Sequence, residues 1–324
     1  MKLLKLVPDD TQIPFIKWRY VALLFSTVLM VLSAVLFFSR GLNFGIDFSG
    51  GTLIEIRLPQ AADLGQIRGI VGSLGLGDVK IQGIDEPTDV AIFVQAQSLD
   101  SPGASDEAAE EAREQAVAAI VQEALAQALG SDITYLRIEV VGPKVSGELV
   151  QKGTIAVVFS LLSMLVYIWL RFEWQFSVGA VLALIHDVIL TVGMFALVQL
   201  EFNLTSIAAI LTIVGYSMND TVIIYDRIRE NLRKYKKMPL QELIDLSLNN
   251  TLSRTIMTSG TTLLALFSLY SFGGEVIRSF TFAMIWGIFV GTYSTLYVAS
   301  SLLLFTGVKR EWAGAGVKAV KARP

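Results

Sequence analysis

The sequence predicts a polytopic α-helical membrane protein with six transmembrane helices and a small α+β, ferredoxin-like domain between helices 1 and 2. Composition is the first reason, because 53% of the 324 residues are apolar and only 17% are charged, against about 25% charged in soluble domains. The second reason is six apolar runs of at least 18 residues, close to the roughly 20 that a spanning helix needs. The third is one long polar stretch, residues 39–152, between the first two runs.

The apolar runs give the expected membrane spans. They cover residues 20–38, 153–170, 176–200, 202–225, 254–274 and 279–308. The first run follows Lys17 and Arg19 but is longer than the core of a signal peptide, so we expect an uncleaved anchor.

The charge distribution predicts the orientation. Sixteen Lys and Arg residues lie on one side of the six-span arrangement, in residues 1–19, at Arg171, in the loop 226–253 and in the tail 309–324. The short loops on the other side hold only Arg278. Because the basic side of a membrane protein is cytoplasmic, we expect a cytoplasmic N-terminus and a cytoplasmic tail.

The stretch 39–152 predicts an acidic domain on the opposite side. Its 8 Lys/Arg and 17 Asp/Glu leave a net charge of −9. Alternating and helical apolar patterns predict elements in the order strand, helix, strand, strand, helix, strand. They cover residues 52–58, 62–74, 79–84, 89–96, 106–129 and 134–141. This order is that of a split βαβ fold, an antiparallel sheet with helices on one face.

The cytoplasmic loop 226–253 carries one further helical pattern, in residues 238–250. Leu240, Leu243, Ile244 and Leu248 share one helix face. We expect a short amphipathic helix that lies along the cytoplasmic interface.

Soluble catalysis has few residues to use in this chain. There is no cysteine, the one histidine is His186, and no glycine-rich loop with a phosphate-binding lysine opens a helix. We therefore expect no enzymatic activity, no metal and no cofactor other than protons as a coupling ion.

Charged residues inside the predicted spans are the informative ones, because each costs about 2.5 to 3.5 kcal/mol on insertion scales and faces the bundle interior. Asp220 in the fourth span and Arg254 at the start of the fifth both lie toward the cytoplasmic side. A nearby arginine and desolvation act on a carboxyl in opposite directions, so the pair can exchange protons as the arginine moves. A static ion pair between two helices explains the same positions equally well.

His186 and Asp187 lie side by side in the third span. A lone buried histidine is more often a structural hydrogen-bonding residue than a proton carrier. Neighbouring residues point about 100° apart on a helix, so we expect only one of the two to line the bundle interior.

A glycine-rich segment, N-F-G-I-D-F-S-G-G-T, joins the first span to the outer domain. Alternating Phe44, Ile46 and Phe48 are expected to bury one face, and Gly45, Gly50 and Gly51 permit close approach or unusual φ values. A hinge and a rigid anchor in which Asp47 caps a turn are both compatible with the pattern.

Five motifs in order resemble the SecD/SecF family of protein-export membrane proteins, which is related to the resistance-nodulation-division transporters. They are F-G-I-D-F-S-G-G-T, V-G-P-K-V-S-G-E-L, the H-D pair, G-Y-S-M-N-D-T-V-I-I-Y-D-R-I-R-E-N and T-L-S-R-T-I-M-T-S-G-T-T. They extend from the first span to the fifth, and the likeness covers nearly the whole chain.

The resemblance implies a multi-pass protein of the bacterial inner membrane that pairs with SecD beside the SecYEG channel, with YajC as a further partner. It implies that the proton-motive force promotes late steps of polypeptide translocation into the periplasm, with Asp220 and Arg254 in proton transport. Weaker expectations are that Asn219, Thr221, His186 and Asp187 line a polar pathway, and that Gly45, Asp47, Gly50 and Gly51 form a coupling segment. Two alternatives remain, a proton-coupled exporter of small molecules and a non-transporting membrane assembly factor.

Overall fold

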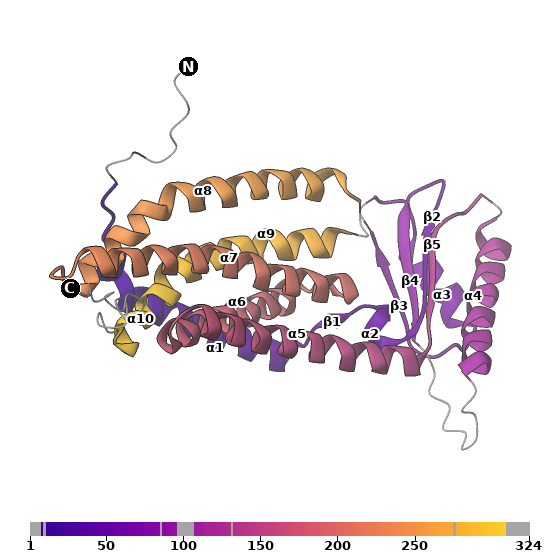
Figure 1. Cartoon of the computed structure of the whole chain (residues 1–324). Helices are drawn as coiled ribbons and strands as arrows, with labels where there is room; N and C mark the ends of the chain where they lie inside the picture. The colour runs from indigo at the N-terminus through magenta and orange to yellow at the C-terminus, as the bar shows by residue number, and fades with distance from the viewer. Residues whose placement is uncertain are drawn as a thin grey trace, which may run out of the picture. The chain divides into compact units, whose positions relative to one another are not determined.

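The computed structural model describes residues 8, 11–84, 86–95, 107–130, 132–274 and 277–308. The chain divides into two compact units, a membrane unit that ends at Asn43 and resumes at Ala156, and an outer domain, Phe44–Ile155 (Figure 1). Of the predicted N-terminal segment 1–19, residues 1–7, 9 and 10 lie outside the described residues. The predicted tail 309–324 lies outside them as well.

The membrane unit contains six helices that are long and apolar enough to cross a membrane, within the part of the chain that the structure describes. The first five are α1 (Arg19–Arg40), α5 (Pro143–Arg171), α6 (Trp174–Val198), α7 (Leu204–Lys234) and α8 (Leu240–Phe272). The sixth consists of α9 (Arg278–Tyr293), the π-helical segment η3 (Ser294–Ala299) and α10 (Ser300–Thr306). A 3-10 turn, η1 (Phe15–Trp18), precedes α1. The expected six-span architecture is confirmed. Several helices extend beyond the apolar runs, because hydropathy marks the part suited to lipid and not the end of the helix.

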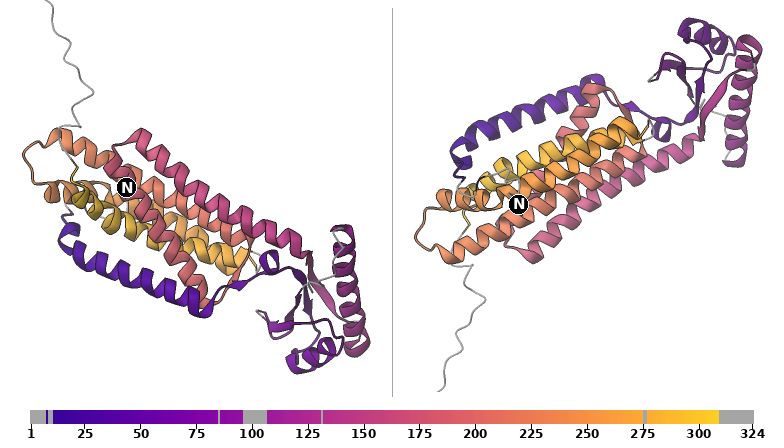
Figure 2. Two further views of the ribbon diagram at one scale, coloured as in Figure 1. Left: turned by 90° about the horizontal axis from the view of Figure 1, so that it is seen from below. Right: turned by 90° about the horizontal axis from the view of Figure 1, so that it is seen from above.

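The six spans differ in how much neighbouring helices cover them. Half of the most apolar stretch of α6 and of α7 is buried, against 11% for α5. Figure 2 shows α1 at the edge of the bundle. The exposed apolar side chains of α1 and α5 are those expected of helices that face lipid or a partner subunit.

Close packing at the centre depends on glycines. A Cβ atom at Gly287 of α9 would overlap Ile213 of α7, and one at Gly291 would lie 3.1 Å from the Ser217 Cβ. The Gly287–Gly291 pair has the GxxxG spacing that lets membrane helices approach each other closely.

The expected amphipathic helix at 238–250 needs a correction, because residues from Leu240 onward are the first turns of α8, which continues to Phe272. No glycine or proline interrupts the chain between Leu240 and Gly260, so nothing ends the helix. Leu243, Ile244 and Leu248 are fully buried in the bundle core instead of lying on the membrane surface.

The outer domain has the predicted ferredoxin-like fold, with a sheet in the order β3-β4-β2-β5 whose neighbouring strands pair antiparallel. Its elements are β2 (Gly51–Arg57), α3 (Leu64–Gly72), β3 (Val79–Gly83), β4 (Asp89–Gln95), α4 (Glu107–Leu129) and β5 (Thr134–Val141). Figure 1 shows α3 and α4 on the same face of the sheet. The alternation in β2 explains this arrangement, because Ile54 and Ile56 are fully buried under the helices with Val71 and Leu125.

The other face of the sheet carries charged side chains beside a small buried apolar cluster that includes Leu53 and Ala91. Arg57 on β2 makes two hydrogen bonds, 2.8 and 2.7 Å, with the Asp89 carboxylate on β4. The hydrogen bond from Arg57 holds the pKa of Asp89 below its ordinary value, and it raises the pKa of Arg57 in turn. Burial raises the pKa of Glu55, although Arg137 lies 3.6 Å away and acts against this.

The glycine-rich segment folds into more than one element, which corrects the expected single alternating face. Residues Ile46–Ser49 form one helical turn, α2, and only Ile46 is buried, while Phe44 is 48% exposed. A helical turn does not place residues i, i+2 and i+4 on one side, which explains the difference. Gly50 ends the turn with φ +67°, and a Cβ there would lie 3.3 Å from the Pro143 Cα.

Asn43 ends the membrane unit and lies in the two-residue strand β1 (Asn43–Phe44), which pairs with β6 (Glu201–Phe202). The Asn43 amide donates to the Gln199 carbonyl at 3.1 Å. Gln199 donates in turn to the Gly41 carbonyl at 3.1 Å. The end of α1 is therefore tied to the connection between α6 and α7.

Candidate functional site: polar side chains inside the membrane unit

Asp220 lies in the middle of α7 and is 5% exposed. It lies next to Thr255 of α8 and interacts electrostatically with Arg254, which is also on α8. One of its carboxylate oxygens, Oδ2, is buried and has no hydrogen-bond partner among the described residues. An unpaired buried carboxylate oxygen is unfavourable, so this atom is a place where a proton can bind.

Arg254 lies near the middle of α8 and is exposed. It makes no ion pair with another described residue, although it is close enough to Asp220 to act on its charge. The structure therefore brings the two residues together on adjacent helices, α7 and α8, without locking them into a bidentate pair.

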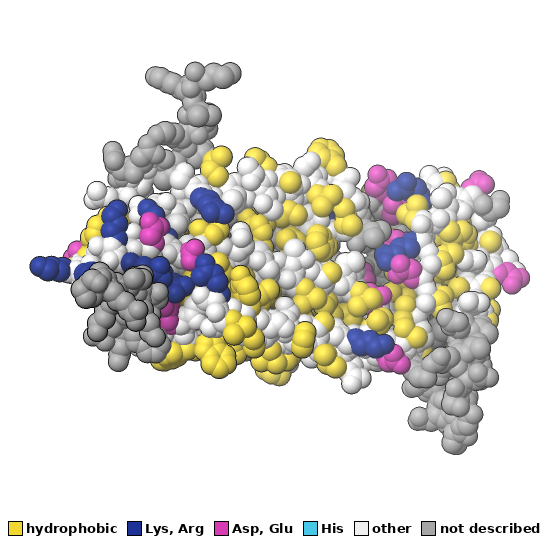
Figure 3. Space-filling view, in the orientation of Figure 1, with side chains coloured by type: hydrophobic (Ala, Val, Ile, Leu, Met, Phe, Trp, Pro, Cys, Tyr) yellow, Lys and Arg dark blue, Asp and Glu magenta, His cyan; other side chains and the backbone are white. Residues whose placement is uncertain are grey.

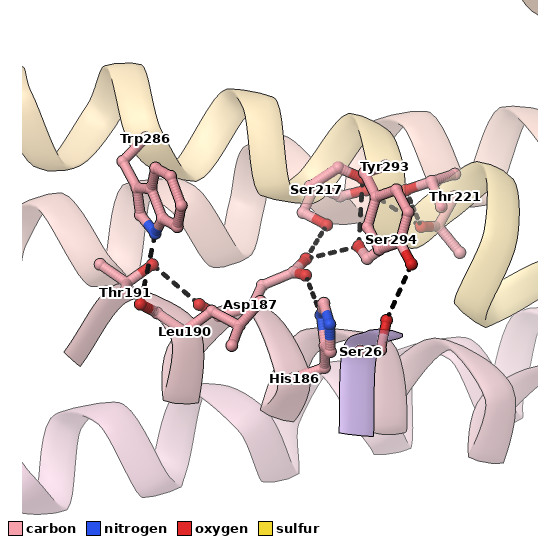
Figure 4. A network of polar contacts seen from close by, with 12 residues as sticks. Ser26, His186, Asp187, Leu190, Thr191, Ser217, Thr221, Trp286, Tyr293 and Ser294 are labelled. Carbon is pink, nitrogen blue, oxygen red and sulfur yellow. Dashed lines mark hydrogen bonds and ion pairs between the residues drawn. The ribbon is translucent and has the colours of Figure 1, made fainter. Parts of the chain in front are cut away.

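A second polar group, which we call the Asp187 network, joins α6, α7 and η3 (Figure 4). Asp187 of α6 is 1% exposed and accepts hydrogen bonds at its Oδ2 from Ser217 of α7, 2.7 Å, and Ser294 of η3, 2.8 Å. Its Oδ1 lies 2.9 Å from the His186 Nδ1. One carboxylate therefore contacts side chains of α6, α7 and η3.

His186 is 2% exposed, so both members of the H-D pair are buried and the expectation that only one lines the interior is wrong. The reason is that α6 contacts α1, α7 and α9 on different sides, so more than one direction from this helix is interior. The Nε2 atom of His186 is buried and has no partner among the described residues. Because Nδ1 faces Asp187, Nε2 is the ring atom left for a further partner.

Further hydroxyl groups extend the Asp187 network toward α1 and η3. The Tyr293 hydroxyl donates to the Ala22 carbonyl at 2.8 Å and lies 3.1 Å from the Ser26 Oγ. Thr221 of α7 lies 3.0 Å from Thr295 of η3, oxygen to oxygen. The end of α9 and the start of η3 thus present consecutive residues, Tyr293 to Thr295, to the helices α1, α6 and α7. π-bulges such as η3 are frequent at functional sites.

Two of the weaker sequence candidates take different positions. Thr221 is 2% exposed and belongs to the Asp187 network. Asn219 is exposed on α7, and no hydrogen bond among the described residues joins it to either polar group. The sequence did not indicate four other members of the network, Ser217, Ser294, Tyr293 and Ser26. The i, i+4 spacing of Ser217 and Thr221 in a membrane span is a signal that could have indicated Ser217.

Comparisons with known proteins agree with this architecture. Residues 120–309 match the family described as "Protein export membrane protein SecD/SecF, C-terminal", and residues 35–62 match "SecD/SecF GG Motif". The second match includes the glycine-rich segment at the start of the outer domain.

Curated relatives match over nearly the whole chain. The chain is 47% identical to a protein translocase subunit SecF of Rhodobacter capsulatus over 310 residues, 95% of this chain and 92% of the relative. It is 48% identical to a protein translocase subunit SecF of Cereibacter sphaeroides over 307 residues, 95% of this chain and 93% of the relative.

Two solved structures of SecDF are also similar. A crystal structure of SecDF from Thermus, described as a translocon-associated membrane protein, has a TM-score of 0.80 and 35% identity over 92% of this chain. A SecDF in a super-membrane-facing form has a TM-score of 0.66 and 35% identity over 94% of this chain. This chain spans 39% of the first SecDF chain and 40% of the second. It belongs to the SecD/SecF family of protein export membrane proteins, as a SecF.

Proposed function

We propose that this chain works with SecD in the bacterial inner membrane and uses the proton-motive force to promote late steps of protein translocation through the SecYEG channel. The observation that carries the proposal is the buried Asp220, whose Oδ2 has no partner among the described residues and which lies beside Arg254. Such an intramembrane ionisable residue is typical of a proton pathway. The translocase names of the relatives support the biological context.

The mechanism follows from the pair. When Arg254 is close, its positive charge favours the ionised Asp220 and releases the proton. When Arg254 moves away, the buried carboxylate is left uncompensated and takes up a proton. A proton that enters from one side and leaves toward the other therefore requires a relative displacement of α7 and α8, and this displacement is the mechanical output. The chemistry needs no metal and no organic cofactor.

The Asp187 network has a different role in this proposal. Its hydrogen bonds hold α6, α7 and η3 together, which gives α7 a fixed support against which α8 moves. His186 and Asp187 therefore position α7, and Asp220 and Arg254 carry the proton. The segment Gly45, Asp47, Gly50 and Gly51 transmits the displacement to the outer domain.

Partners and orientation complete the proposal. A SecD subunit supplies the second half of the assembly, which the likeness to part of the longer SecDF chain supports. The basic ends of α5 and α7 lie on the cytoplasmic side with both termini, and the outer domain is periplasmic. YajC is a further proposed partner, and the translocating polypeptide meets the complex on the periplasmic side.

Reconstitution tests the proposal. Vesicles that contain SecYEG, SecD and this chain are loaded with a precursor arrested part of the way through, and a proton gradient is imposed. The proposal predicts that completion depends on the gradient only when the chain is present. Equal completion with and without the chain rules out the translocation role, and protection of cells from toxic compounds by the chain indicates a small-molecule exporter instead.

A further inference from the structure

A basic cavity lies at the end of the membrane unit where α5 and α7 finish. It encloses about 960 Å³ and is lined by residues of α7 and α8 together with the last residue of α5. Figure 3 shows Lys and Arg side chains gathered at this end, and hydrophobic side chains along the length of the helices. The cavity lies outside the Asp187 network, which occupies the bundle interior.

The cavity holds more positive than negative charge. Its six cationic lining residues are Arg171, Arg227, Arg229, Arg233, Lys234 and Arg254, and its two anionic ones are Asp226 and Glu230. Each carboxylate is already paired. Asp226 lies 3.1 Å from Arg171, and Glu230 lies 2.6 Å from Arg227.

The remaining cations are left without a carboxylate in the cavity. Arg233 and Lys234 make no ion pair with another described residue. Arg229 is already engaged, with Glu173 at 3.3 Å outside the lining. The cavity therefore keeps unpaired cationic donors, and an anionic oxygen is the acceptor that suits them.

The level of the cavity along the helices identifies the source of that anion. Arg171 ends α5, and the residues just before it, Trp169 and Leu170, are 64% and 82% exposed. Exposed tryptophan next to a terminal arginine is typical of the membrane–water interface. Basic pockets between transmembrane helices at that level bind the head groups of anionic lipids.

Two arginines of the lining, Arg171 and Arg229, are held in fixed positions by neighbouring groups. The Arg171 guanidinium lies 4.9 Å from the centre of the Phe172 ring and the Arg229 guanidinium lies 5.3 Å from it. The Arg229 Nη1 donates to the Arg171 carbonyl at 3.2 Å. Cations that are already positioned lose less conformational entropy when an anion binds.

We propose that this cavity is a binding site for the phosphate-bearing head group of an anionic phospholipid. Arg233 and Lys234 contact the phosphate oxygens, and the acyl chains lie against the exposed apolar side chains near Leu170. Arg254, the proposed partner of Asp220, also lines the cavity, but it is not one of the proposed phosphate contacts, and the test below does not depend on translocation.

Lipid titration of the purified full-length chain tests the proposal, with native mass spectrometry to measure bound phosphatidylglycerol and phosphatidylcholine. The variant pair Arg233→Gln and Lys234→Gln removes two cavity cations. Each cation near a membrane surface contributes about 1 kcal/mol, so the double variant is expected to bind phosphatidylglycerol about 30-fold more weakly. Binding of phosphatidylcholine is expected to stay unchanged.

A matched control removes the same charge outside the cavity. Lys236 and Lys237 follow in the turn after α7 and do not line the cavity, so Lys236→Gln with Lys237→Gln should change the affinity less than twofold. The charge-conserving pair Arg233→Lys and Lys234→Arg should keep most of it, which shows that loss of affinity is not loss of folding. Equal weakening in the control pair overturns the proposal in favour of diffuse surface charge. Displacement of the lipid by inorganic phosphate at millimolar concentration overturns it in favour of a soluble anion.

Discussion

The Ser217 hydroxyl of α7 donates a 2.7 Å hydrogen bond to the Asp187 carboxylate of α6, and Asp220 lies one turn further along α7. Residues three apart on a helix lie on neighbouring parts of its surface, about 60° apart. Ser217 is tied to α6, and Asp220 presents a carboxylate with an unpaired oxygen near Thr255 and Arg254 of α8. A helix that is held to one neighbour and titratable beside another can transmit protonation to it.

Removal of the Asp187 carboxylate should destabilise the membrane unit more than removal of any one of its donors. Asp187→Ala leaves Ser217, Ser294 and His186 without their acceptor, whereas Ser217→Ala leaves two of the three contacts. Hydrogen bonds between membrane helices average about 0.6 kcal/mol each and reach about 1.7, so Ser217→Ala should lie in that range and Asp187→Ala should exceed it. Unfolding of the full chain in mixed micelles measures both, and equal effects of the two variants would contradict the network.

Gly193 of α6 should tolerate no larger residue. A Cβ there would overlap Ser33 of α1, including its backbone, so relaxation of a side chain cannot relieve the clash. Gly193→Ala is expected to destabilise the chain by about 1 to 3 kcal/mol. Gly215→Ala is the matched control, since nothing lies within 4 Å of a Cβ at that position, and its unfolding should match the wild type within about 0.5 kcal/mol.

The Gly287 position should behave differently, because the obstacle there is a side chain. A Cβ at Gly287 overlaps Ile213 of α7, so Gly287→Ala is expected to destabilise the α7–α9 contact. A second substitution, Ile213→Ala, should recover part of the loss, although a cavity in the core then costs some stability. Additive losses in the double variant, measured in the same unfolding experiment, would show that these helices are not in close contact.

The outer domain should lose stability in acid through Asp89. The pKa of Asp89 is held below its ordinary value by Arg57, so its contribution is fully present above the ordinary carboxyl pKa. That contribution is lost as the pH falls through the lower folded pKa. Hydrogen exchange of β2 and β4 amides in the full chain, corrected for the intrinsic rate at each pH, should show this loss, and Asp89→Asn should remove it.

Glu55 should act with the opposite sign. Burial raises its pKa, so it favours the folded state most below the ordinary pKa of a free glutamate, and this advantage is lost as the pH rises through the raised folded pKa. Glu55→Gln should therefore slow exchange of the β2 amides near neutral pH and leave it unchanged in acid. Faster exchange at neutral pH would mean that the Arg137 contact outweighs the cost of burial.

Local patterns predicted the outer domain almost element by element. Alternation in β2 and β4 and helical spacing in α3 record which side is buried, and the Ala/Glu-rich run without glycine or proline predicts α4. The same approach failed inside the membrane. A span is apolar on all sides, so its sequence carries little information about which face meets a neighbour. For this reason the sequence did not predict that both His186 and Asp187 are buried. Nor did it predict that Asn219 is exposed although it adjoins Asp220.

Other features depend on interactions distant in the sequence. The π-helical segment that presents Ser294 to Asp187 lies in an apolar run that gives no sign of a change in helical register. The sequence predicted the apolar helix face formed by Leu243, Ile244 and Leu248. It did not predict that the helix bundle covers this face, because a membrane surface can cover an apolar face equally well.

The central claim is that Asp220 carries the proton whose movement drives translocation. The most direct measurement is gradient-dependent completion of an arrested precursor, together with proton uptake, in vesicles that contain SecYEG, SecD and either the wild-type chain or a variant. Asp220→Asn should abolish both signals and Arg254→Ala should reduce both at least tenfold, while Asp220→Glu retains part of each and Asn219→Ala leaves both unchanged. Full gradient-dependent completion with Asp220→Asn would contradict the account and leave Asp220 with a purely structural role.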